Sequence, residues 1–133
     1  MKHSGEIASV IEWAEGCGYD VVISRDGDDS IDRASRVIEI NSNNSEQTQL
    51  YVLLHECGHA LIYKNKSGFG VENVFEMYSE NSSIYKVFRV IEEVEAWRRG
   101  LSLASRLGID IDRVKWDRYV ARAIKKYMDW AIN

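Results

Sequence analysis

The chain has 133 residues, a net charge of −4, 45% hydrophobic and 29% charged residues, which is typical of one soluble globular domain spanning residues 1–133. The acidic balance argues against a general nucleic-acid binder, and the absence of an eighteen-residue apolar run argues against a membrane span. Only two cysteines and an N-terminus without an apolar signal stretch favour a reducing, cytoplasmic compartment without a disulfide framework.

The first forty residues predict one helix and two strands. Ser4 can cap the helix, and Gly16 and Gly18 are expected to end it. The β-branched runs in Tyr19–Ser24 and Arg36–Ile40 predict the strands. The helix has one apolar face at spacing i, i+3, i+4, i+7: Ile7, Val10, Ile11 and Ala14.

Four aspartates fall between the two strands, within Arg25–Arg33. A calcium loop is one interpretation, but the segment lacks the ligand spacing and closing glutamate of a helix-loop-helix calcium site. A solvated turn is therefore the prediction for this segment, whose aspartates are Asp26, Asp28, Asp29 and Asp32.

A long buried helix is predicted after the polar loop Asn41–Gln49. Asn44 or Ser45 can cap it, and it is expected to run from Glu46 to Tyr63. This helix is apolar nearly all round, which indicates burial. Its main core stripe is expected to be Leu50, Leu53, Leu54, Cys57 and Leu61.

Two histidines of this helix stand four residues apart. His55 and His59 lie one turn apart on one face, so their imidazoles can converge on a single metal ion, usually Zn²⁺. Glu56 lies about 100° further round and can take a proton from a metal-bound water, whose pKa zinc lowers to about 7. Because each buried polar group needs a partner, two histidines beside a carboxylate predict a metal site rather than core histidines.

The segment after the metal helix predicts a flexible loop and a short amphipathic helix. The loop is Lys64–Gly70, by composition. The helix carries Val71, Val74, Phe75 and Tyr78 at helical spacing, and it either covers the core or flanks a substrate cleft.

Two more helices are predicted in the C-terminal part. Ser82 or Ser83 can cap the first, which is expected to end near Leu107-Gly108, and Asp110 can cap the last. The last helix has a predicted buried stripe: Trp116, Val120, Ala123, Ile124, Tyr127, Met128 and Ala131. Its basic face carries Arg118, Arg122 and Lys125; it is either a nucleic-acid surface or a solvated face, and the interspersed Asp117 and Asp129 favour the latter.

A carboxylate from the helix after Ser82 is the expected third metal ligand, because no third histidine follows at a suitable spacing. Glu93 lies roughly 80° from the predicted core direction, Glu95 about 120° and Glu92 about 180°. Glu93 also shares its side with Ala96 and Gly100, which allow close approach of another helix. The phase thus favours Glu93 over Glu95 as the ligand, and both Glu92 and Glu95 are expected to be solvated. The core direction is defined by Val87, Val90, Ile91, Val94, Trp97 and Leu101.

The run Leu53-Leu54-His55-Glu56-Cys57-Gly58-His59-Ala60-Leu61 follows a β-branched strand and precedes a helix with Glu93-Val94-Glu95-Ala96. This pattern resembles a minimal gluzincin-type zinc metallopeptidase and is similar to the small cytoplasmic peptidases of the ImmA/IrrE type and related phage-encoded zincins, over about residues 37–107. In that family the glutamate of Glu-x-x-Ala is the third zinc ligand, which corresponds to Glu93. Trp97 stands where the family usually has Asn or Asp.

These observations predict an α+β, mainly helical zincin-like fold with a two- to three-stranded sheet and the metal held between two helices. The expected function is zinc-dependent hydrolysis of a protein or peptide substrate, with His55, His59 and Glu93 as ligands and Glu56 as general base. The strand before the metal helix is expected to pair with an extended peptide. The alternative is a catalytically silent zinc-binding regulatory or host-interaction protein. Candidates for the oxyanion donor, by residue type only, are Tyr51, Tyr63, Tyr78 and Tyr85.

Overall fold

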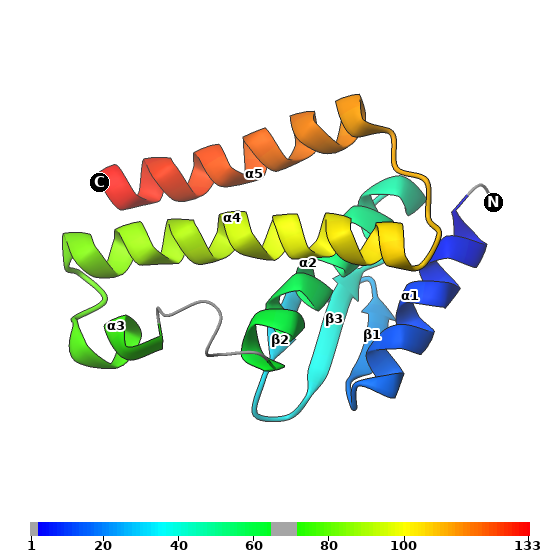
Figure 1. Cartoon of the computed structure of the whole chain (residues 1–133), viewed down its shortest axis with the longest axis horizontal. Coiled ribbons are helices and arrows are strands. Elements are labelled where there is room, and N and C mark those ends of the chain that lie inside the picture. Colours follow the sequence, from blue (N-terminus) through cyan, green and yellow to red (C-terminus); the bar gives the residue numbers. More distant parts are fainter. Residues whose placement is uncertain (1–2, 65–71) are drawn as a thin grey trace.

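The computed structural model describes residues 3–64 and 72–133 and confirms a mainly helical α+β fold (Figure 1). In that part of the chain, no helix combines the length and the apolar character that crossing a bilayer requires. The elements in chain order are α1 (Ser4–Gly16), β1 (Asp20–Ser24), β2 (Ser30–Asp32), β3 (Val37–Asn41), α2 (Glu46–Lys64), α3 (Glu72–Met77), α4 (Ser83–Arg106) and α5 (Arg113–Ile132).

The sheet has the order β1-β3-β2, with β1 parallel and β2 antiparallel to β3. Because β3 is paired on both sides, the prediction that the strand before the metal helix offers a free edge is wrong. The edges of the sheet are β1 and the short strand β2, which lies inside the segment predicted to be a turn. Around it the aspartates serve turns as expected: the Asp29 carboxylate accepts bonds from the Asn41 and Asn44 amides, and Asp32 accepts from the Ala34 and Ser35 N–H groups.

Helix α2 lies at the centre of the fold, as its apolar sequence predicts. Eleven of its 19 residues are buried, because α4 packs on one side of it while α1 and β3 pack on others. Ser45 caps it by accepting a hydrogen bond from the Thr48 N–H at 3.2 Å. The largest fully buried side chains are Val10, Ile38, Ile40, Leu50, Leu53, Leu54, Cys57 and Leu103.

The backbones of α2 and α4 touch where they cross. A Cβ added at Gly58 would lie 1.9 Å from the Ala96 carbonyl oxygen, and one added at Gly100 would lie 2.5 Å from the Leu54 carbonyl oxygen. Each glycine therefore receives the backbone of the opposite helix. This contact confirms the prediction that Ala96 and Gly100 allow close approach of another helix.

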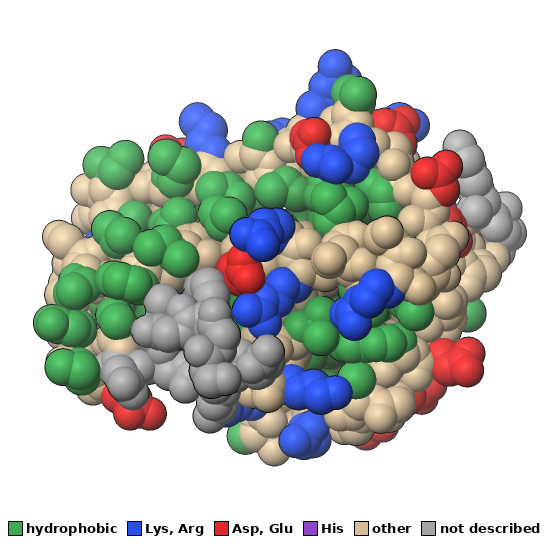
Figure 2. Space-filling view, in the orientation of Figure 1, with side chains coloured by type: hydrophobic (Ala, Val, Ile, Leu, Met, Phe, Trp, Pro, Cys, Tyr) green, Lys and Arg blue, Asp and Glu red, His purple; other side chains and the backbone are tan. Residues whose placement is uncertain are grey.

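The predicted core direction of α4 is wrong. Val87, Ile91 and Val94 are 51%, 41% and 45% exposed. Figure 2 shows hydrophobic side chains gathered over the N-terminal half of α4 and the C-terminal half of α5. The side that faces the core instead carries two glutamates and small residues, because it faces a polar site. Its buried residues are Tyr85, Glu92, Glu93, Ala96, Trp97, Gly100, Leu103 and Ala104.

The predicted stripe of α5 is buried only at its start. Trp116 is buried, whereas Tyr127 and Met128 are exposed, because α5 extends along α4 without a further layer above it (Figure 1). Its cap is Asp112, which accepts bonds from the Val114 and Lys115 N–H groups, rather than the predicted Asp110.

The other helix ends are close to the predicted ones. Ser82 caps α4 by accepting from the Tyr85 N–H. His3, not Ser4, occupies the N-cap position of α1. The short helix predicted around Val74 is α3, whereas Val71 and most of the predicted loop (65–70) lie outside the described residues.

Candidate metal centre

The structure brings His55, His59 and Glu93 together between α2 and α4. One donor atom from each residue lies within 4.8 Å of the others. Glu93 Oε1 is 3.1 Å from His55 Nε2, and Glu93 Oε2 is 2.7 Å from His59 Nε2. Because the glycine-mediated crossing brings α4 against α2, the carboxylate reaches both imidazoles.

This donor set fits a divalent metal ion. His55 Nε2 is buried and has no hydrogen-bond partner although a carboxylate oxygen is 3.1 Å away. An imidazole nitrogen in that position costs free energy unless a proton or a cation is shared with the carboxylate. Two imidazoles and one carboxylate are a common zinc ligand set, and they leave one coordination position for water or substrate.

Glu92, predicted to be solvated, is buried beside His59. It is only 5% exposed, and its Oε1 lies 3.3 Å from His59 Nδ1. Arg89 holds the same carboxylate from the other side, with Nη1 3.4 Å from Oε1. A carboxylate on the second nitrogen of a ligating histidine fixes the tautomer and the ring orientation. The sequence placed Glu92 wrongly because the helical phase was measured from an incorrect core direction.

Glu95 lies away from this cluster. Its carboxylate pairs with Arg99 at 2.8 Å and with Arg98 at 3.6 Å. Of the three glutamates considered as third ligand, Glu93 is thus the one that lies with both histidines.

The charges at the centre are strongly coupled. Burial alone would lower the pKa of His59, but the close Glu92 and Glu93 carboxylates outweigh it and raise the pKa to about 10. Burial likewise opposes ionisation of Glu93, yet contacts with His55 and His59 lower its pKa to about 2. Burial raises the pKa of Glu56 in spite of the two histidines. The ionised Glu93 carboxylate is therefore available to a cation, which would compete with the proton that His59 holds.

Trp97 fixes the other histidine. Its ring stacks on the His55 imidazole, with centroids 4.1 Å apart and 8° between planes. Trp97 in turn packs edge-on against Trp116 and Tyr119 of α5. Trp97, which stands where the family usually has Asn or Asp, therefore packs directly on a candidate metal ligand.

An open cavity of about 450 Å³ adjoins the centre. Of the four tyrosines considered from sequence, Tyr63 and Tyr85 line it, Tyr51 is buried in the core, and Tyr78 is not among the lining residues. Tyr127 was missed. It also lines the cavity, and burial followed by the Glu93 charge raises its pKa to about 12. No local sequence pattern identifies Tyr127 as a site residue, because α5 is brought to the cavity by the tertiary fold.

Comparison with known proteins gives a family for this geometry. No curated protein and no solved structure matches the chain significantly. The Peptidase_M78 family profile, described as the IrrE N-terminal-like domain, matches residues 19–97. That range contains the sheet, α2 and the part of α4 that carries Glu93. Since the match covers more than half of the chain, the protein belongs to the Peptidase_M78 family and carries its metallopeptidase-type domain.

Proposed function

We propose that the protein is a zinc-dependent peptidase that hydrolyses a peptide bond of a protein substrate. The observation that carries this proposal is the convergence of two imidazoles and the Glu93 carboxylate, with Glu56 beside them, on the wall of an open cavity. Zinc held there by His55, His59 and Glu93 would supply Lewis-acid activation of a water molecule and of the scissile carbonyl.

Glu56 is the general base in this proposal. Its side chain is 4% exposed and lines the cavity, with Oε1 3.8 Å from His55 Nδ1. Burial raises its pKa, which suits a group that takes a proton and returns it near neutral pH. Glu56 accepts the proton of the attacking water and delivers it to the leaving amine.

We infer that the substrate chain would lie along β2. Asp29, Ser30 and Ile31 line the same cavity as the histidines, and β2 is an edge of the sheet. An extended peptide can add to such an edge by backbone hydrogen bonds. Tyr63, Tyr85 and Tyr127 also line this cavity, and their hydroxyls are candidates to stabilise the developing oxyanion.

We further propose a reducing, cytoplasmic setting. Cys17 and Cys57 are both free thiols. Burial raises the pKa of Cys57, so this thiol is kept protonated inside the metal helix.

The experiment compares the parent with His55→Ala and Glu56→Gln. Metal analysis is expected to give one zinc per parent chain, none in His55→Ala and one in Glu56→Gln. Cleavage of a proteome-derived peptide library, read by mass spectrometry, is expected for the parent alone. A parent that binds zinc and cleaves nothing would favour the silent regulatory protein, whereas a Glu56→Gln variant with full cleavage would remove Glu56 from the mechanism.

A further inference from the structure

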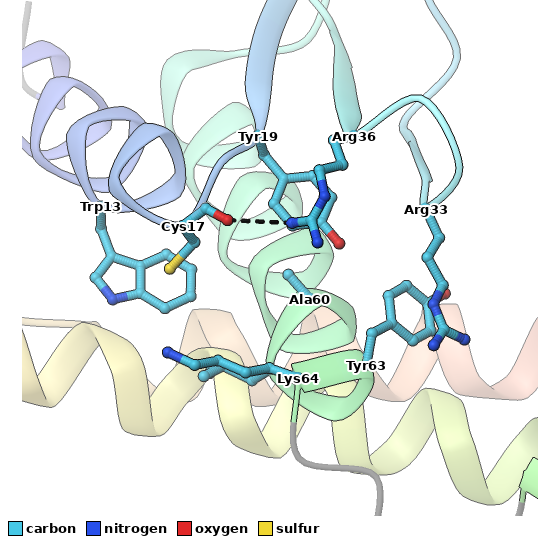
Figure 3. Close-up of a pocket in the computed structure, with 9 residues that line it drawn as sticks. Trp13, Cys17, Tyr19, Arg33, Arg36, Ala60, Tyr63 and Lys64 are labelled. Atoms are coloured by element: carbon cyan, nitrogen blue, oxygen red, sulfur yellow. Dashed lines mark hydrogen bonds between the residues drawn. The ribbon is translucent and has the colours of Figure 1, made fainter.

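A second cavity, of about 280 Å³, opens where the end of α2 meets α1 and the turn before β3. Three cationic and three aromatic side chains contribute to its lining: Arg33, Arg36, Lys64, Trp13, Tyr19 and Tyr63 (Figure 3). The proposed peptidase chemistry uses only Tyr63 of these six. The other five residues therefore have no role in that chemistry, and we consider which ligand their cavity fits.

The lining is positively charged although the chain carries a net charge of −4. No aspartate or glutamate lines the cavity. Within residues 3–64 and 72–133, none of the three cations has a carboxylate within ion-pair distance. Figure 3 shows the Arg36 guanidinium and the Lys64 side chain on opposite sides of the space, with Lys64 extended toward Trp13. Cations held around one hollow without counter-charges favour an anionic ligand.

The aromatic rings provide flat apolar faces next to these charges. The Arg33 guanidinium carbon lies 5.0 Å from the Tyr63 ring centroid, and that of Arg36 lies 5.5 Å from the Tyr19 centroid. Such contacts orient the guanidinium groups by cation–π attraction. Trp13 lies across the space from Tyr63 (Figure 3). A planar ring that enters the cavity therefore has aromatic surfaces on which to stack.

Arg36 is held in a conformation that favours glycine. Its φ angle is 57°, and it is the one residue other than glycine with a positive φ among those the structure describes. The guanidinium Nη1 donates to the Cys17 carbonyl oxygen at 3.3 Å, which keeps the side chain against the cavity. A non-glycine residue in this region costs of order 1 kcal/mol or more, and such strain is found at binding sites.

We propose that this cavity binds a free nucleoside monophosphate, with the phosphate held by Arg36, Arg33 and Lys64 and the base stacked on the aromatic lining. The charge of the lining favours an oxyanion, and its aromatic rings favour a planar group. The volume lies just under the roughly 300 Å³ at which pockets for drug-sized ligands begin. A ligand with one base and one phosphate fits these three constraints together.

Tyr63 connects this cavity with the metal centre. It lines both cavities, and its ring lies 6.1 Å from the His59 ring, with 28° between the planes. The occupant therefore touches a side chain that packs on a candidate metal ligand. Binding itself does not depend on peptidase activity, so the two proposals stand or fall separately.

The test titrates the metal-free full chain with the four common nucleoside monophosphates, their nucleosides and inorganic phosphate by isothermal titration calorimetry. At least one monophosphate is expected to bind about tenfold more tightly than phosphate or its own nucleoside, because base stacking adds to ion pairing. Absence of binding would overturn the proposal, and so would phosphate or a nucleoside binding as tightly as the best monophosphate. Tighter binding of a 5′-phosphorylated oligonucleotide than of any monophosphate would overturn the assignment to a free nucleotide.

Arg36→Gly separates binding from folding. Glycine accepts a φ of 57° without strain, so the melting temperature is expected to stay the same or rise, while monophosphate affinity falls at least about tenfold. Arg25→Gly is the matched control: it removes the same charge from an exposed turn outside the cavity and is expected to leave affinity unchanged. Lys64→Gln, at the exposed end of α2, is expected to weaken binding as well. Equal losses of monophosphate affinity in Arg36→Gly and Arg25→Gly would refute a specific site. An unchanged affinity in both Arg36→Gly and Lys64→Gln would refute it as well.

Discussion

Substitution of Gly58 by alanine tests whether the backbone contact between α2 and α4 creates the metal centre. The added Cβ would lie 1.9 Å from the Ala96 carbonyl oxygen. An ordinary close contact between carbon and a carbonyl oxygen is about 3.3 Å, so the helices must separate locally by roughly 1.4 Å. Glu93 lies one helical turn before Ala96 and moves with that backbone.

The expected loss of metal binding follows from this displacement. Functional constellations tolerate about 0.5 Å, and metal–ligand distances only about 0.2 Å. Gly58→Ala is therefore expected to lower zinc affinity at least about tenfold, measured by competition with a chromogenic chelator. Overpacking costs about 1–3 kcal/mol, while the gain in helix propensity offsets about 1 kcal/mol. The melting temperature of the metal-free protein is thus expected to fall by a few degrees.

Gly5→Ala is the matched control for this substitution. Gly5 also lies in a helix, but a Cβ there meets nothing within 4 Å. The control is expected to bind zinc as the parent does and to be as stable or slightly more stable. If Gly58→Ala also retains parental zinc affinity and melting temperature, the helix contact does not set the geometry of the site.

Three further predictions concern the surroundings of the metal. Glu92→Gln is expected to lower zinc affinity about 10–100-fold in the same chelator assay; an unchanged affinity would mean that Glu92 does not orient His59. Because the pKa of His59 is raised to about 10, its stabilising contribution to the metal-free protein is complete below pH 6.5 and is lost as the pH rises through about 10. Thermal unfolding without metal should show that decline, and apparent zinc affinity should rise about tenfold per pH unit from 7 toward 10 as the bound proton is displaced; pH-independent values would contradict both expectations. Tyr127→Phe is expected to retain zinc and, if its hydroxyl meets the oxyanion, to lower kcat about 10²–10³-fold, whereas an unaffected kcat would leave that role to Tyr63 or Tyr85.

Local sequence predicted the elements that are specified locally. The extent of α2 and the placement of His55 and His59 on one face follow from helical period and apolar content. A helix that is apolar on all sides can be predicted without knowledge of its tertiary neighbours. The strands β1 and β3 were likewise predicted from β-branched runs. Residues 30–32 form a strand because they pair with β3. A pattern of three residues is too short to predict that pairing.

The surroundings of the site could not be read from periodicity. The apolar residues of α4 do not mark its buried side, because the side that faces the candidate metal centre buries carboxylates. Glu92 and Glu93 therefore point inward, and Ile91 stays exposed. Glu93 nevertheless lies with the histidines, because Ala96 and Gly100 identified the contact side of α4 independently of its apolar residues. The positions of Glu92 and Tyr127 depend on how α4 and α5 are rotated in the tertiary fold, which local sequence does not specify.

Trp97 makes the orientation of His55, a candidate metal ligand, depend on the C-terminal helix. Its indole stacks on His55 and makes edge-to-face contacts with Trp116 and Tyr119, so α5 supports the imidazole through Trp97. The family match ends at residue 97, and this support comes from beyond that boundary. A fragment that ends at residue 97 would keep every candidate ligand but lose the α5 contacts that hold Trp97 against His55.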